Sequence, residues 1–319
     1  MKAMNELWYQ NQFAVGPDGM TPKDILKKRE IHDACDVVSS FRAYLDLDPH
    51  VALTSADPIP RGLAILDRRI GLRTLKAFEM SDDEHSLIRT LHSSRMDNEK
   101  VNNKELDTIQ QSYDRIADEY ARHIYTELQH KPLDRELLTR FASRVKGKGD
   151  VCDMGCGPGH VARYLRDTGA SVSGLDLSPR MIEEARRLNP DITFRQGNML
   201  ALDLPDASVA GITAFYAVVN LPKASLPQVF REMARVLQPD GLLLLSHHVG
   251  DETIRRDEWW DRPIAMDFHF LQPLAVKGEL EAAGLVIDEI VEREPYAPEV
   301  EHQSRRAYIF ARKPAAAAV

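Results

Sequence analysis

Cysteine, excess positive charge and long apolar runs are all scarce in this sequence of 319 residues. The three cysteines, Cys35, Cys152 and Cys156, are odd in number and lack the spacing of a metal site, so we expect reduced thiols in a cytoplasmic protein. The formal net charge of −8 disfavours nucleic acid as a partner, since a protein that neutralises many phosphates normally carries the opposite sign. No apolar run reaches the roughly 18 residues of a membrane span, and the N-terminus lacks the apolar core of a signal peptide, so we expect no membrane association.

Apolar residues are nevertheless plentiful enough for a full core, at 43% of the chain. From residue 149 onward, short apolar runs alternate with helical patterns, which is typical of a parallel α/β sheet. The predicted strands are Asp150–Met154, Ser171–Leu175, Thr193–Gln196, Gly211–Phe215 and Leu242–Ser246, followed by a hairpin over Val286–Arg293 and Arg305–Arg312.

Residues 1–96 are expected to form a separate, small α+β module of unknown role. Thr21, which precedes a proline, suits the start of a helix that continues on helical apolar spacing to Leu45. Residues 63–78 are predicted to form a β-hairpin, because apolar residues flank a charged turn that ends in glycine. Ser81–Glu84 fits a capping box that opens another helix.

A polar stretch, residues 97–108, lacks large apolar residues at regular spacing and is the predicted linker. It would separate the first module from a second domain over residues 109–319, which begins with amphipathic helices and continues into the α/β pattern.

The segment V-C-D-M-G-C-G-P-G, residues 151–159, places a glycine-rich turn between a short strand and a helix. Gly155 and Gly157 let the backbone approach a ligand closely, because no Cβ stands in the way. Such turns lie at the carboxyl ends of parallel strands, where open α/β sheets bind ligands. The dinucleotide fingerprint G-x-G-x-x-G is the competing interpretation, but the third glycine comes one residue early and His160 stands in its place. The turn therefore favours a ligand without a pyrophosphate.

A carboxylate, Asp176, ends the second predicted strand, where it can accept hydrogen bonds from both hydroxyls of a ribose. Together with D-M-G-C-G-P-G, the segments G-L-D-L-S-P-R-M-I, R-Q-G-N-M and A-R-V-L-Q-P-D-G-L-L-L-L resemble the successive motifs of class I S-adenosyl-L-methionine (SAM)-dependent methyltransferases of the small-molecule type. The resemblance runs from about Gln111 to Lys313. It implies a Rossmann-like, seven-stranded, mostly parallel sheet with helices on both faces, and SAM as the cofactor.

The resemblance also implies which residues hold SAM. Asp153 and the glycine backbone would hold the methionine end, where a carboxylate helps to balance positive charge. Met181 would pack on the adenine face, and Asn198 with Met199 would meet the adenine edge. Many relatives have aspartate where Asn198 stands, but an amide still offers an acceptor and a donor. The predicted cofactor-binding residues are Tyr113, Tyr120, Asp153, Gly155, Cys156, Gly157, Asp176, Leu177, Met181, Asn198, Met199 and Phe215.

Two pairs of residues have alternative interpretations. The segment from Tyr113 to Tyr120 resembles the helix that covers the cofactor in such enzymes. Tyr120 equally suits the core face of an amphipathic helix. Tyr216 and Asn220, after the fourth predicted strand, should face the transferring methyl group. Each of them either contacts the substrate or is a satisfied buried polar group.

An aromatic insertion follows the fifth predicted strand, and in small-molecule members such an insertion roofs the substrate pocket. His247 and His248, with Tyr216, are the catalytic candidates, because an unperturbed histidine titrates near pH 6.5. For any single histidine, a structural role is the simpler interpretation. Adjacent residues on a strand point to opposite faces, so no metal site is expected. The predicted substrate-binding residues are Asn220, Trp259, Trp260 and His269.

Methyl transfer to O, N or C of a small molecule is the preferred function. One alternative is a SAM-binding regulatory or assembly subunit without turnover. Another is a protein or RNA methyltransferase, which is disfavoured because residues 214–218 lack the N-P-P-Y-type tetrad of many base-amino enzymes. A basic stripe for RNA in the N-terminal module remains an alternative to a solvated face. The acceptor, its reacting atom, the use of a general base, the role of residues 1–96 and the oligomeric state do not follow from these motifs.

Overall fold

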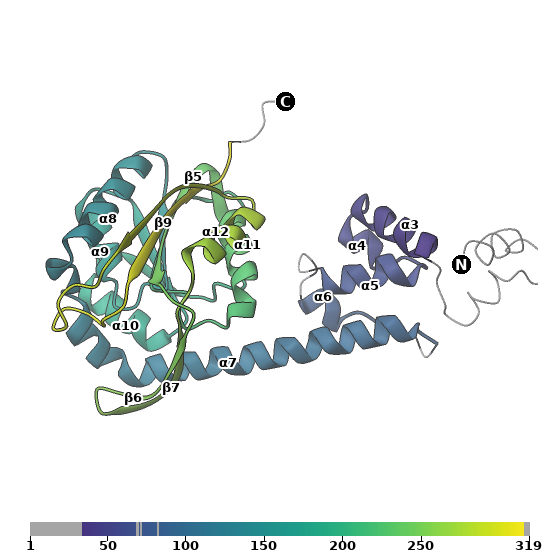
Figure 1. The fold of residues 1–319 in the computed structure, drawn as a ribbon, viewed down its shortest axis with the longest axis horizontal. Helices are drawn as coiled ribbons and strands as arrows, with labels where there is room; N and C mark the ends of the chain where they lie inside the picture. The colour runs from purple at the N-terminus through teal and green to yellow at the C-terminus, as the bar shows by residue number, and fades with distance from the viewer. Residues whose placement is uncertain (1–33, 68–69, 71, 82, 316–319) are drawn as a thin grey trace, which may run out of the picture. The chain divides into compact units, whose positions relative to one another are not determined.

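The computed structural model describes residues 34–67, 70, 72–81 and 83–315 (Figure 1). The chain forms two compact units, Met1–Val101 and Asn102–Val319. The boundary between them falls inside the predicted linker, and a helix, α7 (Ser86–Ile124), runs through that whole segment. The predicted helix start at Thr21 lies outside the described residues.

The described part of the N-terminal unit is helical. It contains α3 (Ala34–Leu45), α4 (Pro49–Ala52), α5 (Pro58–Leu66), α6 (Leu72–Lys76) and the beginning of α7. The predicted hairpin is therefore wrong, and so is the α+β class of the module over its described residues.

The local sequence explains this helical outcome. Asp57 caps α5, because its side chain accepts a hydrogen bond from the Ile59 N–H and a proline follows it at the first helical position. The buried side chains of Ile65, Ile70 and Leu75 then close one small core. The predicted capping box lies slightly too early, since α7 begins at Ser86.

The C-terminal unit is built on a sheet with the strand order β3-β2-β1-β4-β5-β9-β8. Its strands are β1 (Val151–Met154), β2 (Val172–Asp176), β3 (Thr193–Gln196), β4 (Val209–Phe215), β5 (Leu237–His248), β8 (Val286–Arg293) and β9 (Arg306–Arg312). The first five are parallel, and β9 runs antiparallel to both β5 and β8. This confirms the predicted seven-stranded, mostly parallel sheet and its terminal hairpin. The strand order reverses between β1 and β4, which is where open α/β sheets bind ligands.

Helices cover both faces of this sheet (Figure 1). On β5, Leu242 and Leu244 pack into the core beneath α8 (Pro132–Val145) and α9 (His160–Asp167). The alternate residues, including Leu243, pack into the opposite core. That second core also contains residues of α7, α11 (Leu226–Val236) and α12 (Pro273–Ala282), while α10 (Pro179–Leu188) packs against β2 and β3.

A separate two-stranded hairpin, β6 (Thr253–Trp259) and β7 (Arg262–His269), packs against α7. Its two-residue turn, Trp260 and Asp261, has φ angles of 50° and 58°, as a type I′ turn requires. The Trp260 ring stacks on His123 of α7 at 4.7 Å between centroids, which helps to hold a non-glycine residue in this conformation. Short 3-10 turns lie at Glu127–His130 and Lys223–Ser225. No helix within the described ranges is both long and apolar enough to cross a membrane.

Candidate functional site

A cavity with about 690 Å³ of empty space opens at the carboxyl ends of β1, β2 and β4, beneath the last part of α7. We call it the cofactor cavity. Apart from Asp153 and Cys156, it is lined by all the predicted cofactor-binding residues: Tyr113, Tyr120, Gly155, Gly157, Asp176, Leu177, Met181, Asn198, Met199 and Phe215. The wall also contains Tyr216 and Asn220. Two apolar residues of α7 that the motifs do not reveal, Leu106 and Ile109, line the cavity as well.

The glycine turn leaves room along one wall of this cavity. Gly155 has a φ of 68°, and a Cβ there would lie 2.5 Å from the Cβ of Ala217. Gly157 has a φ of 51°, and its Cβ would lie 3.6 Å from the ring of Tyr120. Position 155 therefore needs glycine for close backbone approach as well as for conformation, whereas position 157 favours glycine for its conformation alone.

Asp176 is held firmly at the end of β2. Its two carboxylate oxygens accept hydrogen bonds from the N–H groups of Ser178 and Gly157, each at 2.9 Å. Burial raises the pKa of Asp176 to about 6 in spite of these bonds, so the carboxylate is charged at neutral pH. An anion fixed in this way presents its remaining lone pairs in set directions.

Asp153 lies near the end of the neighbouring strand, β1, at 1% exposure. The Thr213 hydroxyl donates to Oδ1 at 2.8 Å, whereas Oδ2 is buried with no hydrogen-bond partner among the described residues. Burial raises the pKa of this carboxyl to about 6. The backbone N–H of Ala162 and the nearby His160 lower the pKa of this carboxyl and so oppose the effect of burial in part. Asp153 does not line the cofactor cavity and lies behind its glycine turn.

Cys156 does not line the cavity. Its side chain is 2% exposed and packs with Ile182 and Phe194 in a small core, and its backbone N–H donates to the carbonyl of Leu175. The thiol of the predicted cofactor-binding residue Cys156 therefore lies behind the turn, and only its backbone is part of the turn.

The cavity is closed on one side by aromatic and amide groups. The Tyr113 hydroxyl donates to Oδ1 of Asn220 at 2.7 Å, and the Asn220 amide donates to the carbonyl of Asp267 in β7 at 2.8 Å. Asn220 is thus a satisfied polar group that also lines the cavity. Tyr120 both lines the cavity and packs edge-on against Trp259, with 5.7 Å between ring centroids, so its position is compatible with either of its alternative interpretations.

Comparison with known proteins agrees with this geometry. Residues 151–241 match a family described as Methyltransferase domain. The C-terminal unit is a class I, SAM-dependent methyltransferase domain. Residues 19–96 match a different family, the SF0329 protein family.

Curated relatives match over part of their length. A malonyl-[acyl-carrier protein] O-methyltransferase of Enterobacter lignolyticus is 33% identical over 47% of this chain and 57% of its own length. The 2-methyl-6-phytyl-1,4-hydroquinone methyltransferase of Synechocystis is 32% identical over 36% of this chain and 37% of its own. The chain thus spans about half of the length of such relatives or less. A solved DhpI–SAH complex has the same fold, with a TM-score of 0.53, 21% identity, and coverage of 66% of this chain and 97% of that one.

Tyr216 stands at the far wall of the methyltransferase domain's cofactor cavity in a strained conformation. Its φ is 53°, which is uncommon for a bulky residue, and its N–H donates to the Ser246 hydroxyl at 3.1 Å. Lys131 Nζ and the Arg306 guanidinium lie 5.7 and 5.6 Å from the ring centroid. Burial raises the pKa of Tyr216 above its ordinary value, so its hydroxyl stays protonated at neutral pH.

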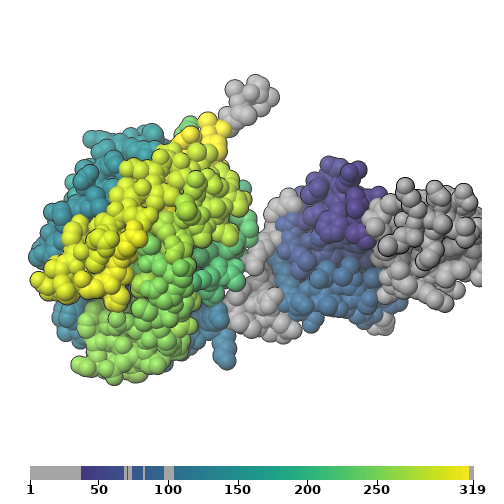
Figure 2. Space-filling view, viewed as in Figure 1, coloured from purple at the N-terminus to yellow at the C-terminus, as the bar shows by residue number. Residues whose placement is uncertain are grey.

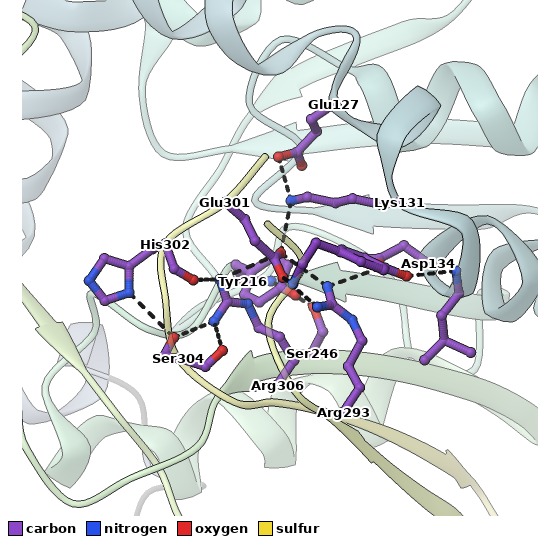
Figure 3. A network of polar contacts seen from close by, with 12 residues as sticks. Glu127, Lys131, Asp134, Tyr216, Ser246, Arg293, Glu301, His302, Ser304 and Arg306 are labelled. Atoms are coloured by element: carbon purple, nitrogen blue, oxygen red, sulfur yellow. Dashed lines mark hydrogen bonds and ion pairs between the residues drawn. The ribbon is translucent and has the colours of Figure 1, made fainter. Parts of the chain in front are cut away.

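A buried network of charges surrounds Tyr216 (Figure 3). Lys131 Nζ lies 2.7 Å from Glu127, and Arg293 contacts both Glu301, at 3.0 Å, and Asp134, at 3.2 Å. Sequence reasoning missed these residues, because the partners come from separate segments and each alone resembles an ordinary surface charge.

The predicted general bases are not placed for that role. His247 is fully buried, does not line the cofactor cavity, and has its pKa lowered by burial. His248 contacts Tyr216 at 5.2 Å between ring centroids, and burial, with Arg306 nearby, lowers its pKa to about 2. His247 is therefore corrected to a core residue, and His248 is a neutral, weakly basic ring in the wall.

The predicted substrate-binding residues of the hairpin separate into two groups. Trp259 lines a second cavity, whereas Trp260 stacks on His123 and lines neither. His269 also lines neither cavity, and its ring accepts from or donates to Thr253 at 2.9 Å. In the part of the chain that the structure describes, no group of three or more histidine, cysteine, aspartate or glutamate side chains is arranged to hold a metal ion.

Proposed function

We propose that this domain transfers a methyl group from SAM to a small-molecule acceptor. The observation that carries the proposal is the cofactor cavity itself, where a glycine turn and a fixed carboxylate on the next strand meet at the sheet's reversal point. The buried carboxyl of Asp153 lies just before this turn, on β1. The residues fit the parts of SAM. Asp153 would face its ammonium, Asp176 its ribose hydroxyls, and Leu177 and Met181 its adenine.

The domain's own contribution to the reaction is the positioning of two reactants. When bound, SAM supplies an electrophilic methyl group: the acceptor atom bonds to the methyl carbon while the carbon–sulfur bond breaks and the sulfur keeps the electron pair as a neutral thioether. Holding both reactants in line can lower a barrier by roughly 7–11 kcal/mol. Tyr113 and Tyr120, which line the cavity, would cover the bound reactants.

No described side chain of the cofactor cavity is an effective base toward a neutral acceptor. Its ionisable groups are Asp176, whose oxygens already accept two backbone N–H groups, and tyrosines whose pKa values burial raises. No described side chain of the cofactor cavity would therefore take a proton from the acceptor.

A small-molecule acceptor is favoured for two reasons. An aromatic second cavity adjoins the first, and pockets for small molecules are mostly apolar with few placed polar groups. A relative over part of this chain acts on a hydroquinone, as its name states. A cytoplasmic location belongs to the proposal and agrees with the free thiols of Cys152 and Cys156.

Binding of S-adenosylhomocysteine, measured by titration calorimetry, tests the first step. We expect Asp176→Asn to weaken binding by about 10- to 100-fold, since a hydrogen bond to a charged group contributes roughly 1.5–3 kcal/mol. Asp167→Asn, at a carboxylate with a 63% exposed side chain on α9, is the matched control and should leave binding unchanged. Equal affinity in both variants and the wild type would refute the assignment of the site.

Transfer of label from methyl-tritiated SAM tests the second step. The full chain is incubated with a cell extract that has been separated into small-molecule and macromolecular fractions. We expect label to enter a compound of the small-molecule fraction. Label found in protein or RNA alone would identify a macromolecular methyltransferase, and binding without any transfer would identify a regulatory subunit.

A further inference from the structure

A second cavity, with about 430 Å³ of empty space, lies at the end of β5 beneath the β6–β7 hairpin. Aromatic and imidazole rings dominate its wall, and we call it the aromatic cavity. Figure 2 shows the hairpin next to the C-terminal segment that runs between β8 and β9 and contributes one of these rings. The lining residues are His248, Ile254, Arg256, Trp259, Phe268, Phe270 and His302.

The aromatic cavity adjoins the cofactor cavity through two ring contacts. His248 of the aromatic cavity lies 5.2 Å from Tyr216, and Trp259 lies 5.7 Å from Tyr120, measured between ring centroids. Both tyrosines line the cofactor cavity. The walls of the two cavities are therefore in contact at these two pairs of rings.

The charge in the aromatic cavity has one sign. Arg256 is half-buried, its guanidinium lies 5.7 Å from the centroid of Trp259, and it forms no ion pair with any described residue. The lining includes no carboxylate. Burial and the nearby arginines lower the pKa values of His248 and His302, so both rings are neutral at neutral pH. Arg256 is thus the cation of an otherwise apolar, uncharged wall.

The neighbouring residue on β6 shows the contrast. Arg255 points away from this cavity and pairs with Asp257 at 3.1 Å and Asp267 at 3.3 Å. Arg255 is therefore neutralised by carboxylates at the surface, whereas Arg256, the next residue in the chain, faces aromatic rings.

We propose that the aromatic cavity binds the methyl acceptor, and that this acceptor is a flat aromatic molecule with an anionic group that pairs with Arg256. The proposal rests on the proposed function and adds the substrate class. Ring faces and edges of Trp259 and Phe268 suit a planar apolar body. An arginine without a protein carboxylate suits an anion, to which its fork donates two hydrogen bonds.

Binding of 2-naphthoate to the full chain tests this, with uncharged 2-naphthamide as the probe of equal shape. Quenching of the fluorescence of Trp259 and of Trp260, which stacks on it at 4.6 Å between ring centroids, gives both dissociation constants. We expect the wild type to bind the anion about tenfold more tightly than the amide. Arg256→Gln should abolish this preference, while Arg255→Gln should retain it.

Each outcome decides the question. Equal binding of anion and amide by the wild type, or an undiminished preference in Arg256→Gln, would overturn the proposal. The measurement uses no SAM, so its failure is distinct from failure of the proposed function, which would appear as lost S-adenosylhomocysteine binding. Circular dichroism of each variant shows that the fold is retained.

Discussion

Replacing Gly155 by alanine tests how closely the glycine turn approaches the opposite wall of the cofactor cavity. The φ of 68° places the new residue in the left-handed region, which costs roughly 1–2 kcal/mol for a residue with a Cβ. The new Cβ would also lie 2.5 Å from the Cβ of Ala217, and such overpacking typically costs about 1–3 kcal/mol. We therefore expect the free energy of unfolding to fall by about 2–5 kcal/mol, with weaker binding of S-adenosylhomocysteine in whatever protein remains folded.

The chain offers a control for the backbone contribution. Gly169 has a φ of 93°, and a Cβ there would have no heavy atom within 4 Å. Gly169→Ala should therefore show the conformational cost alone, about 1–2 kcal/mol, and normal ligand binding. Urea unfolding of both variants at one pH measures their free energies of unfolding. The difference between the losses in Gly155→Ala and Gly169→Ala is the cost of the close contact with Ala217.

A double-mutant cycle sharpens the test. Ala217→Gly removes the atom that Gly155→Ala would strike, so the two changes together should destabilise the protein less than the sum of the single variants. Additive losses, or equal losses in Gly155→Ala and Gly169→Ala, would show that steric contact at the turn is unimportant and would refute the reasoning.

Two further predictions concern buried charges. Burial raises the pKa of Asp153 to about 6, so the folded protein keeps this proton to a higher pH than the unfolded chain does. The contribution of Asp153 to the free energy of unfolding should thus fall by about 3 kcal/mol between about pH 4 and pH 6 and stay level at higher pH. Urea titrations of Asp153→Asn should lack this fall. Parallel pH profiles of the variant and the wild type would contradict the prediction. Glu301→Gln removes a buried partner of Arg293 and should lower the free energy of unfolding by about 3–5 kcal/mol. Glu292→Gln, which breaks an exposed pair with Arg305, should lower it by about 0–1 kcal/mol. Similar melting temperatures of the two variants would disprove the importance of burial.

Features that depend on local sequence could be predicted. The parallel strands follow from short apolar runs, and the cofactor cavity follows from a glycine turn after one strand and Asp176 at the end of the next. Such strands place their ends at one edge of the sheet, so local patterns were enough to bring these residues together.

Features that depend on packing between distant segments could not. The apolar residues of 63–78 fit a hairpin as well as helices, and the deciding cap, Asp57, lies outside that stretch. His247 and His248 are adjacent in sequence, but strand alternation sends one of them into the core. Arg256 meets His302 only because the hairpin lies over the connection between β8 and β9, and no local pattern marks either of them.

The position of β9 has a consequence for how the domain is made. β9 follows β8 in the chain but pairs between β8 and β5, so it is an interior strand that arrives after its neighbours. While a ribosome has synthesised only as far as β8, the long apolar strand β5 presents an uncovered edge, which is a template for pairing with other chains. The nascent domain thus depends on its last strand for protection from aggregation, and a polypeptide that stops near residue 305 would keep that edge open.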